Sequence, residues 1–283
     1  MLILNRLQHY FYLTRLNKPI GILLLFWPTA WALWLANDGV PPLKLLIIFT
    51  LGVILMRSAG CAINDIADRH IDDKVARTAQ RPIASGKIAV WEALMVAAIC
   101  SVLAFALVLL CNALTIRLAL LGALLAFIYP FLKRITHLPQ CWLGLAFSWG
   151  VPMAFAASTN QVGTNAWLLF LVAAIWPIIY DTMYAIADRP EDLNIGVKST
   201  AILFGKADKL IIGILQILFI LLMIYIGQLF ELSVIYYCSL FVAALLFIYQ
   251  QRLIQHNEPT KCIQAFLNNN LVGLCIFIGI ATS

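Results

Sequence analysis

Residues 43–66 read LKLLIIFTLGVILMRSAGCAINDI. This apolar segment has Lys44 near its start and one further charge, Arg57, within it. It ends on a polar motif that begins with Asn64. A helix that crosses a bilayer needs about 20 predominantly apolar residues, whereas a strand of a membrane barrel alternates apolar and polar residues over about 10. Because the segment is long and continuous, it predicts a membrane-spanning helix with a polar motif at one end.

The same pattern recurs along the whole chain. It has 283 residues, of which 63% are hydrophobic and 11% charged, and its mean hydropathy is +0.93. A soluble domain averages about 25% charged residues, so this chain has too few charges for a soluble surface and too much apolar content for disorder. We expect an all-α, polytopic integral membrane protein with about nine transmembrane helices, and residues 1–283 as a single membrane-embedded domain. The predicted spans are 19–36, 43–66, 89–111, 114–131, 138–157, 165–187, 208–228, 232–250 and 262–281.

The basic residues orient these spans. The net charge is +6 and the pI is about 9.0, which in a membrane protein reflects the positive-inside rule rather than nucleic-acid binding. With the N-terminus in the cytoplasm, 16 basic residues fall in inside segments, and only Lys44 and Arg117 fall outside. The N-terminus is therefore expected inside and the C-terminus outside. The two longest loops, about 67–88 and 188–207, are then cytoplasmic, so we expect function on that side.

Acidic residues gather in two short segments. Eight of the 13 acids lie in 65–73 and 181–192, each where a predicted span reaches the cytoplasm. If the first segment is helical, Asp65, Asp68 and Asp72 share one face because they stand at i, i+3 and i+7.

The second segment has a similar spacing. Asp181 and Asp188 are seven residues apart, and Tyr184 lies on the same helical face. Asp192 follows four residues after Asp188 if the helix continues, but Pro190 can either start a helix or break one.

Carboxylates on one helix face repel one another, so two such faces indicate a cation between them. Oxygen ligands without Cys or His favour Mg²⁺, which proteins usually hold with few carboxylates and with substrate phosphates. Basic side chains that can neutralise a diphosphate follow both segments. The alternative is a solvated loop with ordinary helix-end charges. The basic residues are Arg77, Arg81, Lys133, Arg134 and Lys198.

At these residues the chain resembles the UbiA superfamily of intramembrane aromatic prenyltransferases. The superfamily pattern Asn-Asp-x-x-Asp-x-x-x-Asp is matched in full by residues 64–72, and its second pattern, Asp-x-x-x-Asp, by residues 188–192. Fuller strings, such as Tyr-Pro-Phe-Leu-Lys-Arg at 129–134 and Tyr-Asp-Thr-Met-Tyr-Ala at 180–185, resemble the branch that prenylates 4-hydroxybenzoate. Matching strings run from residue 17 to beyond residue 200.

The resemblance implies nine helices around a central cavity that opens to the cytoplasm. It implies Mg²⁺ bridging the Asp motifs and a polyprenyl diphosphate, and transfer of the prenyl group to the ring of 4-hydroxybenzoate, ortho to the hydroxyl. The product is 3-polyprenyl-4-hydroxybenzoate, an early intermediate of ubiquinone biosynthesis. The expected location is the lipid bilayer of a bacterial inner membrane, with a periplasmic C-terminus and no nucleic-acid partner.

Roles follow from the resemblance for each matching residue. The main metal carboxylates, and the catalytic set, are expected to be Asp68, Asp72, Asp188 and Asp192, with Asn64 and Asp65 in support. Candidate cations for the diphosphate or the benzoate are Arg77, Lys133, Arg134 and Lys198, and Asp181 and Tyr184 are expected to bind substrate. Arg57 lies within a span, where a charge is costly; it either receives the benzoate carboxylate or forms a structural ion pair.

Two other functions compete with this hypothesis. A sister prenyltransferase would act on a naphthoate or a haem, and the choice of substrate would separate it. A cation-coupled transporter also places acids within a membrane, but it predicts acids near the midplane and inverted repeats. Here most acids lie at cytoplasmic span ends, and no clear internal repeat is present.

Overall fold

Residues 2–72 and 78–283 are described by the computed structural model, with side chains from Arg6 onward. These residues form helices and turns and contain no strand. The helices are α1 (Leu2–Leu13), α2 (Ile20–Leu35), α3 (Leu43–Asp68), α4 (Val90–Val108), α5 (Ala113–Leu132), α6 (Pro139–Ser148), α7 (Gly150–Thr159), α8 (Thr164–Ile195), α9 (Thr200–Phe204), α10 (Asp208–Leu229), α11 (Val234–Ile254) and α12 (Pro259–Ala281).

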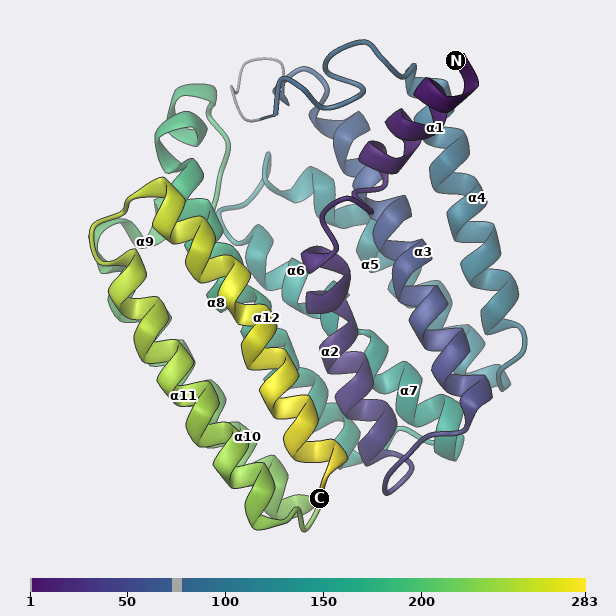
Figure 1. The fold of residues 1–283 in the computed structure, drawn as a ribbon, viewed down its shortest axis with the longest axis vertical. Helices are drawn as coiled ribbons and strands as arrows, with labels where there is room; N and C mark the ends of the chain where they lie inside the picture. Colours follow the sequence, from purple (N-terminus) through teal and green to yellow (C-terminus); the bar gives the residue numbers. More distant parts are fainter. Residues whose placement is uncertain (1, 73–77) are drawn as a thin grey trace.

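The all-helical membrane fold is confirmed. Helices lie at every predicted span, and eight helical segments in the described ranges are long and apolar enough to cross a membrane. The α2 helix has 16 residues and is shorter than these. The predicted span 138–157 is a pair of helices, α6 and α7, that meet at Trp149. The two chain ends lie at opposite ends of the bundle, with α1 beside the N-terminus (Figure 1).

The α3 helix matches the predicted span 43–66 but does not continue to Asp72, so the condition for a shared helical face is not met there. The α3 helix ends at Asp68, and the chain then turns, with the Ile71 backbone N–H donating to the Asp68 carbonyl at 2.7 Å. Asp72 is held beyond the helix, where its carbonyl accepts a hydrogen bond from the Thr78 hydroxyl at 3.0 Å. A loop therefore places Asp72, and helical periodicity does not.

The second acidic segment is one helix. The α8 helix runs through Pro190 and ends only at Gly196, whose φ of +80° is the left-handed conformation that commonly closes a helix. Proline removes one backbone donor but does not end this helix. Asp181, Asp188 and Asp192 therefore lie on a single rigid element.

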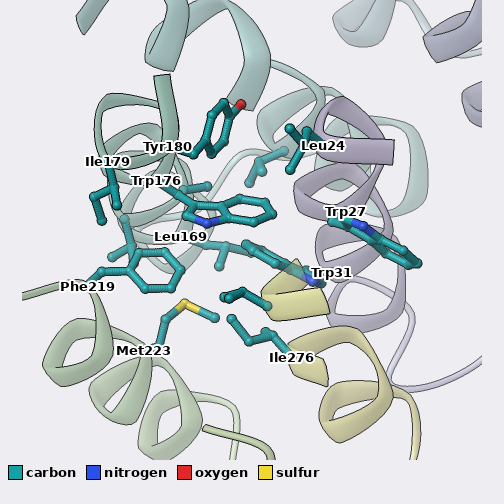
Figure 2. Packing of buried hydrophobic residues seen from close by; sticks show 14 of the residues in the cluster. Leu24, Trp27, Trp31, Leu169, Trp176, Ile179, Tyr180, Phe219, Met223 and Ile276 are labelled. Atoms are coloured by element: carbon teal, nitrogen blue, oxygen red, sulfur yellow. The ribbon is translucent and has the colours of Figure 1, made fainter. Parts of the chain in front are cut away.

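An aromatic core joins α8 to α2, α10 and α12. Trp176 on α8 lies between Trp31 of α2, at a ring-centroid distance of 5.3 Å, and Phe219 of α10, at 6.4 Å (Figure 2). The Trp176 indole N–H donates to the Asn269 side chain of α12 at 2.9 Å. Trp176 and Asn269 are fully buried, where neither lipid nor apolar side chains offer a hydrogen-bond partner. This bond therefore satisfies the polar groups of both residues.

Small residues set how closely the helices approach. A side chain at Gly144 of α6 would lie 2.2 Å from the backbone oxygen of Ala174 on α8. Glycine at this position therefore brings two helix backbones into contact. The contact holds α6 against α8 at Ala174, seven residues before Asp181.

Candidate active site

A cavity of about 1370 Å³ runs through the bundle. One end of the cavity is charged, and its other walls are formed by apolar and small side chains of α3, α4, α5 and α7. The α5 wall is lined by Ala119, Ala123 and Ala126, which leave room because they project little into the cavity. The charged residues that line the cavity include Arg15, Asp65, Asp68, Arg81, Lys133, Asp181, Asp188, Asp192 and Lys198.

Basic residues from other elements hold the carboxylates of the first motif. Asp65 accepts a bond from Arg15 at 2.8 Å and lies 3.4 Å from Arg81. Both carboxylate oxygens of Asp72 accept from Arg81, at 2.9 and 2.8 Å. Asp68 is paired with Lys133 of α5. The repulsion expected between these carboxylates is therefore offset by protein cations.

Asp68 has one oxygen that these contacts leave unused. Its Oδ2 accepts from Lys133 and, at 3.1 Å, from the Asn64 amide. Its Oδ1 is buried and has no hydrogen-bond partner within residues 2–72 and 78–283. A buried carboxylate oxygen without a partner is costly, and it is an acceptor suited to a cation.

Residues of the second motif line the same cavity from α8. Asp181, Tyr184, Asp188 and Asp192 all lie at its wall. The Gln140 side chain of α6 hydrogen-bonds to Asp181. Since one helix carries all four, their relative positions are set by helical geometry rather than by a loop.

The site offers carboxylate oxygens but not a complete set of protein ligands. This suits Mg²⁺ better than a metal ion that takes all its ligands from protein side chains. No group of three His, Cys, Asp or Glu side chains that could hold a metal occurs among the described residues. Mg²⁺ is commonly bound by one or two carboxylates together with substrate phosphates. Carboxylates of both motifs face one cavity, and the unpaired Asp68 Oδ1 offers an acceptor there. The donor set is therefore compatible with Mg²⁺ shared between protein and a phosphate ligand.

Arg57 lies deeper in the cavity than the other cations of the site. Its guanidinium is 5.6 Å from the ring centre of Phe147, a cation–π distance, and it covers the backbone of Gly21. No ion pair joins Arg57 to a carboxylate in the part of the chain that the structure describes. Arg57 therefore makes no direct ion pair among these residues, although its charge attracts the Asp181 carboxylate.

Two of the remaining predicted cations lie near the cavity but make other contacts. Arg134 donates to the Ala67 carbonyl and does not line the cavity within the described ranges. Lys198 lines the cavity, but its Nζ donates to the Ile135 carbonyl at 3.0 Å. Arg77 lies outside the described residues. Asp72 is buried behind Arg81 and is not part of the described cavity wall.

Arg15 is a site residue that sequence patterns did not reveal. It stands in the turn after α1 with a left-handed backbone, φ 55°, and its side chain reaches Asp65, 50 residues away. Burial acts to lower the pKa of Arg15, but the Asp65 carboxylate more than offsets this, so its pKa lies above the ordinary value. No local motif marks such a contact, because only the tertiary fold brings the two residues together.

Asp72 lies outside the spans, and its pKa is displaced. Burial raises the pKa of Asp72, the Arg81 guanidinium acts against this, and Asp68 adds to the rise, so the net pKa lies above its usual range. The Arg81 contact thus keeps a buried acid paired.

Residues 25–272 match the UbiA prenyltransferase family. The chain belongs to this family. A 4-hydroxybenzoate octaprenyltransferase of Coxiella burnetii is 53% identical over 276 residues, which cover 98% of this chain and 96% of the relative. A UbiA homologue of Aeropyrum pernix K1, solved in its apo form, superposes with a TM-score of 0.80 at 27% identity, covering 92% of this chain and 97% of that one.

A more distant solved structure shares the UbiA fold. A UbiA homologue of Archaeoglobus fulgidus, bound to GPP and Mg²⁺, has a TM-score of 0.67 at 17% identity and covers 97% of this chain and all of that one (100%). Membership of the UbiA family argues against the transporter alternative, because the family is one of prenyltransferases. The roles expected for individual site residues stay predictions.

Proposed function

We propose that this UbiA family member transfers a polyprenyl group from polyprenyl diphosphate to the ring of 4-hydroxybenzoate, ortho to the hydroxyl, with Mg²⁺ as cofactor. The observation that carries the proposal is a single cavity with carboxylates and cations at one end and an apolar interior. A diphosphate suits the charged end of the cavity, and a prenyl chain suits its apolar interior. The activity named for the Coxiella burnetii relative supports the same reaction.

The carboxylates proposed to hold Mg²⁺ are those of both motifs: Asn64 and Asp65 support Asp68 and Asp72 on one side, and Asp188 and Asp192 act on the other. Bound there, Mg²⁺ supplies positive charge that stabilises the departing diphosphate. Asp68 Oδ1 is the acceptor with no competing partner among the described residues.

Basic side chains of the protein also stabilise the negative charge of the departing diphosphate. Lys133, Arg15 and Arg81 lie at the charged end of the cavity, each already paired with a carboxylate of the first motif. As the allylic C–O bond breaks, the diphosphate takes the bonding electrons. Cations already in place stabilise that charge without first being brought together. Arg77 and Arg134 were predicted for this role as well, and Lys198 lies within reach of the cavity.

The aromatic acceptor is proposed to lie beside Arg57. The guanidinium pairs with the benzoate carboxylate, and the Phe147 ring beneath it favours a flat aromatic partner. Asp181 and Tyr184 complete this end of the cavity. The ring carbon next to the hydroxyl forms the new C–C bond and then loses its proton.

The apolar interior protects the reaction. Phe49, Met56 and Phe105 line the deep part of the cavity, together with the small α5 residues. A prenyl chain that fills this space displaces water, which would otherwise trap the allylic cation as an alcohol.

We also propose that residues 1–283 form one domain of a bacterial inner membrane. The 16-to-2 distribution of basic residues supports a cytoplasmic N-terminus and a periplasmic C-terminus. The charged mouth of the cavity then faces the cytoplasm.

The deciding test is a membrane assay with polyprenyl diphosphate, Mg²⁺ and a choice of acceptors. We expect prenylated 4-hydroxybenzoate, no product with EDTA, and no product from Asp188→Asn. Glu258→Gln is the control, because this exposed acid pairs with Lys261 and does not line the cavity.

Other outcomes assign the chain differently. Product from a naphthoate or a haem, but not from 4-hydroxybenzoate, would move the chain to a sister branch. Absence of transfer to any acceptor by folded protein would contradict the enzyme proposal.

A further inference from the structure

A second cavity, of about 440 Å³, lies where α1, the end of α3 and the start of α4 meet. It is separate from the active-site cavity, with which it shares Lys87. The α1 helix and the start of α4, which contribute lining residues, lie at the same end of the bundle as the N-terminus (Figure 1). Its lining residues are Arg6, Arg69, His70, Ile83, Gly86, Lys87, Ile88, Ala89, Val90 and Glu92.

Positive charge dominates this second cavity. Arg6, Arg69 and Lys87 line it, and His70 adds two ring nitrogens. The one acid among its described lining residues is Glu92. The cavity therefore carries a net positive charge even before His70 is counted.

Glu92 neutralises only Arg6 among these cations, because its other contacts are to a hydroxyl and a backbone N–H. It is 7% exposed and accepts bonds from Arg6 at 2.9 Å, from the Tyr10 hydroxyl at 2.8 Å and from the Ala89 backbone N–H at 2.8 Å. These bonds fasten α1 to the first turn of α4. Arg6 is thereby committed to Glu92, while Arg69 and Lys87 pair with no carboxylate among the described residues.

The donors of Arg69 and Lys87 have capacity for a ligand. The Arg69 Nη1 donates to the Ile66 carbonyl at 3.1 Å, and its other guanidinium nitrogens have no acceptor within the described ranges. Both residues are exposed at the cavity. An arginine and a lysine that line one cavity suit a phosphate group.

Apolar side chains beside the cavity indicate the source of that phosphate. On α1, Leu7 is 57% and Phe11 45% exposed; on α4, Trp91 is 62% and Leu94 48% exposed. Tryptophan exposed at the first turn of a spanning helix is typical of the headgroup level of a bilayer. Acyl chains can cover these residues only if the phosphate belongs to a lipid.

We propose that this second cavity binds the phosphate of an anionic glycerophospholipid, with Arg69 and Lys87 contacting the headgroup and the acyl chains lying along the apolar residues of α1 and α4. A zwitterionic lipid binds less well, because its own cation repels the same side chains. Free phosphate lacks the apolar contacts.

The test measures lipid binding to the delipidated full-length protein by native mass spectrometry. The probes are phosphatidylglycerol, phosphatidylcholine and inorganic phosphate. We expect phosphatidylglycerol to bind most tightly, and its dissociation constant to rise roughly tenfold or more in Arg69→Gln/Lys87→Gln. Arg69→Gln alone must also weaken binding, since Arg69 does not line the active-site cavity.

The matched control is Lys206→Gln/Arg252→Gln, which removes the same charge from two exposed residues that line neither cavity. We expect less than a twofold change there. An equal loss in the control would show general surface attraction and overturn the site. Equal affinity for phosphatidylcholine, or for inorganic phosphate, would overturn the assignment to an anionic lipid.

Discussion

The two Asp motifs have similar spacing in the sequence but are built in different ways. In the first, α3 ends at Asp68 and a loop carries Asp72 back toward Arg81. In the second, the α8 helix continues past Pro190, so that Asp188 and Asp192 stay one helical turn apart. One motif is assembled from several elements, and the other is part of a single helix.

This difference shows where each motif obtains its rigidity. Ion pairs position the carboxylates of the first: Asp65 with Arg15, and Asp68 with Lys133. The second depends on α8, which is fastened on another side by the ion pair of the half-buried Arg189 with the buried Asp208 and by the aromatic core. Loss of a single cation should disturb the first motif, whereas loss of a packing contact should disturb the second.

The largest effect is expected when one carboxylate is removed from each motif. Asp68→Asn should lower kcat about a thousandfold, as the loss of a major electrostatic contact to a leaving group does. If the motifs act on one diphosphate, the double variant with Asp188→Asn should be little worse than either single variant. Steady-state kinetics of the three variants measures this. Independent, multiplicative losses would contradict a shared site.

The Arg189–Asp208 pair tests how the second motif is held. Asp208 is completely buried, so Asp208→Asn leaves Arg189 without its partner and should destabilise the protein by about 3 kcal/mol. Thermal unfolding in one detergent provides the measurement. Adding Arg189→Gln to Asp208→Asn should restore part of the loss.

The control for the pair is Glu258→Gln, which breaks an exposed ion pair with Lys261 and should cost under about 1 kcal/mol. Strictly additive losses for Arg189 and Asp208 would argue that they do not act as a pair.

Arg81→Lys tests the geometry of the first motif without removing its charge. Lysine loses the fork that reaches both oxygens of Asp72 and approaches Asp65. We expect about a tenfold rise in the Mg²⁺ concentration needed for half-maximal activity, equivalent to about 1.4 kcal/mol. An unchanged Mg²⁺ requirement would show that charge alone, and not the fork, positions the motif.

The smallest effect is expected in the packing that supports α8. Asn269→Leu removes the acceptor of the Trp176 indole within the membrane and should destabilise the protein by about 0.6 kcal/mol, the average for such bonds. Thermal unfolding checks this. The control is Asn268→Leu, which changes the neighbouring residue and removes the acceptor of the Gln250 side chain instead. A larger fall in activity for Asn269→Leu than for Asn268→Leu would support the link between core and second motif.

Much of the fold was predictable because membranes impose simple rules. Long apolar runs predicted helices at every span, since a chain in lipid must satisfy its backbone internally. The exceptions involved breaks: Trp149 divides α6 from α7, and α3 stops at Asp68 although no Gly or Pro marks its end. Gly150 and Pro152 mark the first break, because Pro152 cannot donate to the Ser148 carbonyl, whereas local composition does not signal the second.

The site was predictable in residue type but less so in its contacts. Most predicted residues, including Asp68, Lys133 and Asp188, line one cavity. Arg15 was counted only as an orientation charge, because its partner Asp65 is 50 residues away. Arg134 was expected to serve the site but donates to a backbone carbonyl instead.

The sequence by itself determined the membrane, the helices and the chemical character of the site, because hydropathy, charge and residue type are properties of local segments. Only the tertiary structure decided which cation holds which carboxylate and which segments bend. Such pairings join Arg15 to Asp65 and Arg189 to Asp208. They depend on distances between elements that the packing of small and aromatic residues sets, and no spacing along the chain records those distances.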